Sequence, residues 1–401
     1  MNGMKKTSNK QQGISVSELL SIIPENEIVR LAAETKVDYY SKVLYGRSMF
    51  YMLLMGLLRS ERSSLRLFED VYNRPEFKIM FNLDMYKTVK YNSISERLEV
   101  INVEFFEKLF ELFYEQLSEL YSEEEILSQK IVRVDSTMVC ETSSKLREGM
   151  CVGCKKDGKK QTKYTIAFDG IFPCGVEVFS DQNDLCEDRT IPNVVVMCAE
   201  KYNGKIFAFD RGVQKRETFE ELSKKKIEFV CRLKENSRRE VVRTIETGNG
   251  RRVGSLFLVS DEEVRLFATK KKKPTEETFR LITAVNDKGD KYLFLTNVFD
   301  VLSEVILLFY KKRWDIEVYN FNRFVKQELN FSHFFSTRIN GIKIILYMTL
   351  ILSMLILIYK RKNNLGFKTA KRRFMYELDW MITRIIVQLC GGRDPEIVLR
   401  I

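Results

Sequence analysis

The sequence predicts an α/β protein with a mixed sheet and helices packed on it, between a helical N-terminal domain and a set of C-terminal helices. Three observations support this prediction. Apolar residues recur every three or four positions early in the chain, short β-rich runs alternate with helical segments after residue 128, and helical patterns return after residue 300. At 401 residues, the chain is long enough for two or three units with their own cores.

Residues 1–14 are expected to form a polar, disordered leader, because they lack the apolar core and cleavage pattern of a signal peptide. Residues 15–128 are expected to be helical, as indicated by amphipathic stretches such as SMFYMLLMGLLRS and VEFFEKLFELFYEQLSELY. This pattern fits a domain that only packs and a domain that binds DNA equally well.

Residues 129–236 change to a pattern of alternating strands and helices. The run IVRVD predicts a strand that ends at Asp135, and QTKYTIAFDGIFPCGVEVFS predicts two strands joined by a turn at Asp169-Gly170. A helix over IPNVVVMCAEKY, the strand KIFAFD ending at Asp210, the helix RETFEELSKKK and the strand EFVCRL follow. The order β-β-β-α-β-α-β predicts a mixed sheet with helices packed on it.

Residues 237–300 again have a β pattern, with the runs GSLFLVS, EVRLFATKK, TFRLITAV and KYLFLTNV, and predict an inserted β subdomain. A long helix is expected within residues 301–338, and residues 339–401 are expected to be helical and basic. The apolar run Ile344–Tyr359 has no charged residue over 16 positions. It is slightly short for a bilayer span, so we expect a buried helix packed behind the sheet, with a membrane helix as the alternative.

The charge balance favours a polyanionic partner, because 66 Lys and Arg against 55 Asp and Glu give a net charge of +11. A membrane surface or the ribosome would satisfy the same balance. Eight cysteines without a secretory signal ahead of them indicate a reducing compartment, so we expect a cytoplasmic protein.

Two aspartates, Asp135 and Asp210, each end a predicted strand, where ligand-binding and catalytic groups of open α/β sheets gather. Two such carboxylates could share a divalent cation, although an aspartate after a strand is also a common turn residue. Arg211 and Gly212 follow Asp210 and add a cation and a flexible residue where a phosphate could approach.

A third carboxylate, Glu317, lies on the predicted helix after the β subdomain. Tyr310, Arg313 and Glu317 would occupy a sector of about 60° on that helix, which could equally be a solvated face with an Arg/Glu pair. If the three acids converge, in-line phosphoryl transfer with two hard cations, Mg²⁺ or Mn²⁺, suits them. Hydrolysis by a His-activated nucleophile is a poor competitor, because His333 is the only histidine and no nucleophile elbow accompanies it.

These motifs resemble the DDE transposases of the insertion-sequence-four-like group, which bacterial cut-and-paste mobile elements carry. The resemblance rests on VRVDSTMV, FAFDRGVQKRETFEEL, FVCRLKEN and the helix that begins FYKKRWDIEV. The third motif of the family, Y-x2-R-x3-E-x6-K, is matched by Tyr310, Arg313 and Glu317. The resemblance implies an RNase-H-like core with a β subdomain inserted before the Glu helix, in agreement with the strand order read from the residues.

The resemblance also implies roles for individual residues. Asp135, Asp210 and Glu317 would be catalytic and would bind Mg²⁺, with Mn²⁺ able to substitute, and Tyr310, Arg313, Arg211 and Lys326 would contact DNA. A homodimer would bind double-stranded DNA at terminal inverted repeats, hydrolyse the phosphodiester at the element end and join the freed 3′ hydroxyl to target DNA.

The chain departs from the family at one position of the third motif. Seven residues after Glu317, where the family has lysine, the chain has Phe324, and the nearest lysine is Lys326. On an unbroken helix Lys326 would lie about 180° from Glu317, so a bulge would be needed to bring it back. Two alternatives therefore stay open, an RNase-H-like nuclease without strand transfer and a catalytically impaired DNA-binding or membrane-anchored relative.

Overall fold

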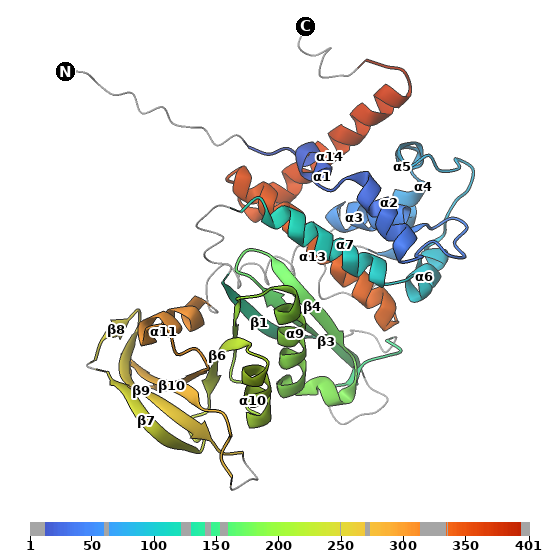
Figure 1. Cartoon of the computed structure of the whole chain (residues 1–401). Helices are drawn as coiled ribbons and strands as arrows, with labels where there is room; N and C mark the ends of the chain where they lie inside the picture. The colour runs from blue at the N-terminus through green and yellow to red at the C-terminus, as the bar shows by residue number, and fades with distance from the viewer. Residues whose placement is uncertain are drawn as a thin grey trace, which may run out of the picture. The chain divides into compact units, whose positions relative to one another are not determined.

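The structure is a computed structural model that describes residues 13–59, 64–121, 130–140, 146–152, 159–248, 250–268, 273–312, 334 and 336–393. The chain divides into two compact units. One unit combines Met1–Leu120 with Arg323–Ile401, and its described elements are helices; the other, Tyr121–Asn322, holds the sheet (Figure 1). The helices predicted at the two ends of the chain therefore belong to one unit.

The helical unit contains the following described helices: α1 (Val16–Ser21), α2 (Glu25–Glu34), α3 (Gly46–Arg59), α4 (Leu65–Asn73), α5 (Pro75–Met80), α6 (Tyr91–Val100), α7 (Glu104–Ser118), α13 (Ile339–Lys362) and α14 (Phe367–Leu389). Polar contacts join its first and last helices. Glu377 of α14 accepts hydrogen bonds from the Val16 N–H of α1 and from the Tyr359 hydroxyl of α13, and Arg59 forms an ion pair with Asp379.

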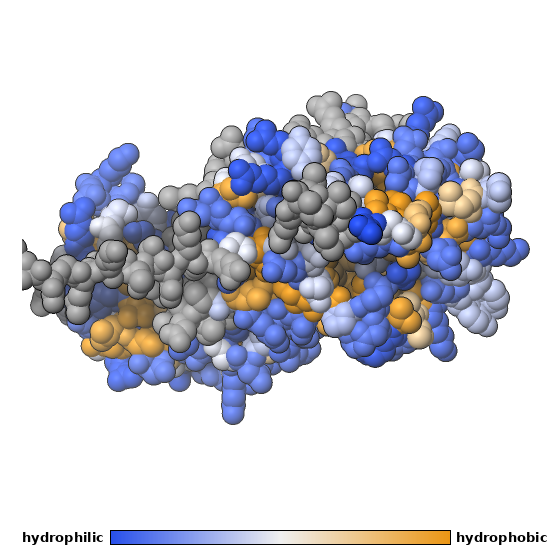
Figure 2. Space-filling model, turned by 90° about the horizontal axis from the view of Figure 1, so that it is seen from above, coloured by the Kyte–Doolittle hydropathy of each residue, from blue (hydrophilic) through white to orange (hydrophobic). Residues whose placement is uncertain are grey.

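Helix α13 contains the apolar run Ile344–Tyr359. It is the one described helix that is long and apolar enough to cross a membrane, yet 94% of its apolar window is buried inside the protein. It packs against α3, α6, α7 and α14. The expected burial is confirmed, and helices of its own unit cover it, whereas we had expected packing behind the sheet. The face seen in Figure 2 is mostly hydrophilic, with hydrophobic side chains in separate patches.

The described residues of the second unit form one sheet of 11 strands. Its strands are β1 (Ile131–Cys140), β2 (Met150–Cys151), β3 (Lys160–Phe168), β4 (Pro173–Phe179), β5 (Ile206–Phe209), β6 (Glu228–Leu233), β7 (Arg239–Thr247), β8 (Arg252–Val253), β9 (Leu256–Leu266), β10 (Phe279–Asn286) and β11 (Lys291–Thr296). The helical elements of this unit are η1 (Gln182–Leu185), α9 (Glu187–Lys201), α10 (Arg216–Lys224) and α11 (Ser303–Lys312).

The core of the sheet has the spatial order β4-β3-β1-β5-β6. Strands β1, β3 and β4 are antiparallel neighbours, whereas β1, β5 and β6 run parallel. Helix α9 connects β4 to β5, and α10 connects β5 to β6. Three antiparallel strands followed by two parallel strands, with helices in the crossovers, form the RNase-H-like arrangement, so the predicted fold class is confirmed.

The strands of the expected β subdomain continue this sheet, because β11 pairs with β6 and is followed by β10, β9 and β7. Two details of the prediction are wrong. The runs GSLFLVS and EVRLFATKK belong to one long strand, β9, and the edge strand β7 was missed because its residues are mostly exposed and polar. Edge strands are commonly protected in this way by charged side chains.

The two faces of the sheet are covered by different helices. Phe219 of α10 stacks on Phe229 of β6, whereas Leu307 of α11 packs in a cluster with Ile206 and Val230. Because neighbouring residues of a strand point to opposite faces, Phe229 and Val230 assign α10 and α11 to opposite faces. The face beneath α11 is the one that concerns the site.

Candidate active site

Asp135 and Asp210 lie side by side at the carboxyl end of the parallel strands. The last parallel pair of β1 and β5 joins Val134 to Phe209, and the next residue of each chain segment is one of the two aspartates. The prediction that β1 ends at Asp135 is wrong, because β1 continues to Cys140 in its pairing with β3. The parallel pairing ends there, however, so Asp135 still occupies the edge at which β5 stops.

The loop after Asp210 is held by hydrogen bonds to carboxylates. Asp210 Oδ1 accepts the N–H of Gly212 at 2.8 Å, which forms a tight turn. The Oδ1 atom of Asp188, in the first turn of α9, accepts the N–H groups of Gln214 and Lys215 at 2.5 and 2.7 Å. These bonds connect the beginning of α9 to the Asp210 loop.

Glu187, the first residue of α9, is the site residue that sequence analysis missed. A Cβ atom added to Gly212 would lie 1.4 Å from Glu187 Oε2 and 3.0 Å from Asp210 Oδ1, so both carboxylates border the bare backbone of this glycine. The Glu187 side chain also hydrogen-bonds to that of Asp210. We had predicted that this helix begins at Ile191, next to Pro192, but it begins one turn earlier.

The electrostatics of Glu187 reflect this crowding of acids. Burial raises the pKa of the Glu187 carboxyl, the negative charges of Asp210 and Asp135 raise it further, and the positive charge of Lys163 opposes them. Lys163 is a buried residue of β3 that donates to the Leu185 carbonyl, and burial lowers the pKa of its ammonium group. The carboxyl end of β1 and β5 thus concentrates negative charge beside one buried cation.

The other predicted site residues divide into two groups. Arg211 is exposed beside Asp210, and Tyr310 is 3% exposed in α11, where its ring contacts Phe294 and borders a cavity of about 510 Å³ that Arg232 and Lys311 also line. The remaining members of the predicted set lie outside the described residues: Arg313, Glu317 and Lys326.

The chemistry of the donor set fits hard divalent cations. Asp135, Asp210 and Glu187 offer carboxylate oxygens, the ligands that Mg²⁺ and Mn²⁺ prefer, and the lack of a Cβ atom at Gly212 lets the Glu187 carboxylate lie against the backbone beside Asp210. Within the described ranges, no three His, Cys, Asp or Glu side chains converge closely enough to hold an ion by themselves. A complete site therefore requires a further ligand or a closer approach of these acids.

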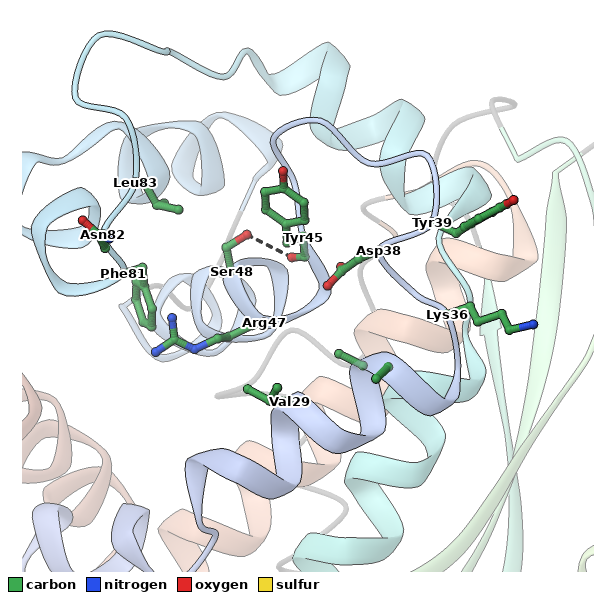
Figure 3. Close-up of a pocket in the computed structure, with 12 residues that line it drawn as sticks. Val29, Lys36, Asp38, Tyr39, Tyr45, Arg47, Ser48, Phe81, Asn82 and Leu83 are labelled. Atoms are coloured by element: carbon green, nitrogen blue, oxygen red, sulfur yellow. Dashed lines mark hydrogen bonds between the residues drawn. The ribbon is translucent and has the colours of Figure 1, made fainter.

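A cavity of about 570 Å³ in the helical unit is a second candidate site (Figure 3). Three of its polar side chains already have partners. Asp38 accepts the Gly46 N–H, the Ser48 hydroxyl donates to the Tyr45 carbonyl, and Arg47 forms an ion pair with Glu25. The pair of Arg47 and Glu25 joins α3 to α2, and the cavity has the character of a packing gap.

The fold and the paired aspartates define an RNase-H-like protein with a carboxylate site at the carboxyl end of its parallel strands. The particular family follows from comparison with known sequences. The family model described as "Transposase DDE domain" matches residues 127–355, which is more than half of the chain. The chain belongs to this family.

Two individual proteins are similar to parts or all of the chain. "Putative transposase y4zB" of Sinorhizobium fredii (strain NBRC 101917 / NGR234) is 28% identical over 167 residues, which is 41% of this chain and 45% of that protein. The chain thus matches less than half the length of this relative. A cryo-EM structure of a piggyBac transposase synaptic complex with hairpin DNA superposes with a TM-score of 0.48 at 13% identity, covering 95% of this chain and 82% of the other.

Proposed function

We propose that this protein is a DNA transposase that cuts phosphodiester bonds at the ends of a mobile element and joins them to target DNA. Asp135, Asp210 and Glu317 are its catalytic carboxylates. The observation that carries the proposal is the register of β1 and β5, which sets Asp135 beside Asp210 within the region that matches the transposase family. Paired carboxylates at such a strand edge suit metal-assisted phosphoryl transfer.

The face on which Asp135 lies supports the choice of Glu317 as the third acid. Ile131 and Asp135 are four residues apart on β1 and so point to the same face, and Ile131 is in register with Ile206. Ile206 packs in the cluster that contains Ile306 and Leu307 of α11. Helix α11 therefore lies on the face that presents Asp135, and Glu317 follows the last residue of this helix, Lys312, by five positions in the sequence.

Each proposed group has a distinct task. Asp135, Asp210 and Glu317 would hold two Mg²⁺ ions, or Mn²⁺ in their place, which when bound lower the barrier at both the attacking and the leaving oxygen. Arg211, Arg313 and Lys326 supply positive charge to neighbouring phosphates, and Tyr310 offers its hydroxyl as a hydrogen-bond donor to a phosphate.

The proposed partner is double-stranded DNA, at the terminal inverted repeats and at the target, with the protein acting as a homodimer. We assign end recognition to the helical domain of residues 15–128, catalysis to 129–236 and 301–338, and supporting roles to the β subdomain of 237–300 and the C-terminal region of 339–401. The net charge of +11 favours such a polyanionic ligand. We propose a cytoplasmic location, since the most apolar helix is buried by its own unit.

Substitution of Asp135 tests the proposal. Asp135→Ala should lower Mg²⁺-dependent cleavage of end DNA by at least about 10³-fold, because a metal ligand contributes several kcal/mol to the transition state, while DNA binding stays within about twofold. Asp300→Ala, which removes an exposed aspartate of the same unit outside the segments assigned to catalysis and end recognition, is the matched control and should cleave normally. Cleavage by Asp135→Ala at the control rate would refute the assignment.

The two alternatives are separated by other measurements. A nuclease without strand transfer would cleave end DNA and yield no joined product when target DNA is added, whereas we expect joined product. An impaired DNA-binding relative would bind end DNA without cutting it in Mg²⁺ or Mn²⁺. A membrane-anchored relative would sediment with membranes after high-salt and carbonate washes. We expect the present protein in the soluble fraction.

A further inference from the structure

We infer that Glu187 is a fourth metal-binding carboxylate of this site, placed there by the first turn of α9. The inference rests on the proposed function, because it concerns the cations that Asp135 and Asp210 would hold. It extends the site beyond the three acids that the resemblance supplies.

The first step of the argument is contact. The position that a Gly212 side chain would fill lies against Glu187 Oε2 and within 3.0 Å of Asp210 Oδ1. Glu187 also hydrogen-bonds to Asp210. Two carboxyl groups in such contact need a proton or a cation between them, because two bare anions repel each other. A divalent cation held by Glu187 and Asp210 would satisfy both groups without a proton.

The second step is that neighbouring contacts fix this arrangement. Asp188, the next residue, binds the backbone N–H groups of Gln214 and Lys215 and so holds the start of α9 against the loop that follows Asp210. These bonds keep the backbone of Glu187 beside the loop that follows Asp210. The N-terminus of a helix also carries a partial positive charge, which stabilises a carboxylate at its first residue.

The third step is charge balance. Two divalent cations carry four positive charges, and Asp135, Asp210 and Glu317 supply three negative ones. Glu187 supplies the fourth negative charge, so the four carboxylates together balance the charge of the two metal ions. Lys163 is buried and donates to the Leu185 carbonyl, so its ammonium group already has an acceptor outside this set of acids.

Metal binding by the full-length protein tests this inference directly. We would titrate the protein with Mn²⁺ alone, following free Mn²⁺ by electron paramagnetic resonance, and compare Glu187→Gln with Glu200→Gln. Glu200 is an exposed residue of the same helix, so its variant makes the same charge change away from the site. Glu187→Gln should weaken at least one Mn²⁺ site by about tenfold or more, whereas Glu200→Gln should bind like the wild type.

Thermal unfolding separates a ligand from a residue with a merely structural role. In EDTA, Glu187→Gln should melt within a few degrees of the wild type, because glutamine can still hydrogen-bond to Asp210. Added Mn²⁺ should then raise its melting temperature less than that of the wild type, since stabilisation by a ligand follows its affinity. Should Glu187→Gln fail to fold, Glu187→Asp keeps the charge with a shorter reach and should show the same weakening in milder form.

The outcomes are distinguishable from those of the proposed function. Wild-type Mn²⁺ affinity and stoichiometry in Glu187→Gln, together with lost binding in Asp135→Asn, would overturn the fourth-ligand inference and leave the proposed site standing. Unchanged Mn²⁺ binding in both variants would overturn the metal site itself. A melting temperature that drops in EDTA while Mn²⁺ affinity stays normal would make Glu187 a structural residue and would also refute the inference.

Discussion

The buried ion pair between Asp261 of β9 and Arg280 of β10 offers a test of how the sheet holds the start of α11. Asp261 is fully buried and Arg280 is 4% exposed. The Arg280 guanidinium donates to both oxygens of Asp261, with distances of 2.6 to 3.0 Å. Ser303, the first residue of α11, donates its hydroxyl to Asp261 Oδ2 at 2.6 Å. One carboxylate thus joins two strands to the start of α11.

Removal of this carboxylate should lower the free energy of unfolding of the sheet unit. Asp261→Ala leaves the Arg280 charge buried without its counter-ion and removes the acceptor of the Ser303 hydroxyl. Arg280 keeps only its bonds to the backbone carbonyls of Val298 and Val301 and to Ser303. Breaking one half of a buried pair costs about 3–5 kcal/mol, so the sheet unit should be destabilised by that amount. Replacing both partners by apolar residues, as in Asp261→Leu with Arg280→Met, should cost much less.

Urea unfolding followed by circular dichroism measures this effect. With an m value of about 3 kcal/mol/M, Asp261→Ala should lower the midpoint of the sheet unit's transition by about 1 M or more. Asp287→Ala, an exposed aspartate of the same unit, is the control and should stay within about 0.2 M, since surface changes are usually within 0.5 kcal/mol. If Asp261→Ala unfolds at the midpoint of the control, the reasoning from burial and pairing is refuted.

Much of the fold could be predicted from the sequence, because local pattern and global topology agree in the core. The turn at Asp169-Gly170 forms as expected, with Gly170 at φ +103°, and the order of strands and helices through residue 233 is confirmed. Local pattern could not show that β1 continues past Asp135, since that length depends on pairing with β3. The polar edge strand β7 was missed for a related reason. Its pairing with β9 makes it a strand, and its own residues have no clear apolar periodicity.

The candidate site was predictable only in part. Asp135 and Asp210 were found because each follows an apolar run, and register then places them side by side. Glu187 was missed because the predicted helix began only at Ile191, whereas the acidic pair Glu187-Asp188 is a signal of a first helical turn. No sequence pattern predicts that Gly212, 25 residues after Glu187, lies against the first turn of α9. Such proximity comes from the fold and not from spacing.

Two further predictions follow from contacts and burial in the sheet unit. Gly212→Ala places a methyl group against Glu187 Oε2, so it should lower end-DNA cleavage by at least about tenfold in a folded protein, and normal cleavage would argue against a shared site for Glu187 and Asp210. Burial, helped by the charge of Asp300, raises the pKa of the Glu228 carboxyl, so ionising Glu228 opposes folding. At a pH above that raised pKa, Glu228→Gln should therefore unfold at a higher urea concentration than the wild type. The gain should disappear at a pH below the ordinary pKa of 4.5, where the Glu228 carboxyl and the glutamine that replaces it are both neutral. A gain that persists unchanged in acid would assign the effect to packing instead of charge.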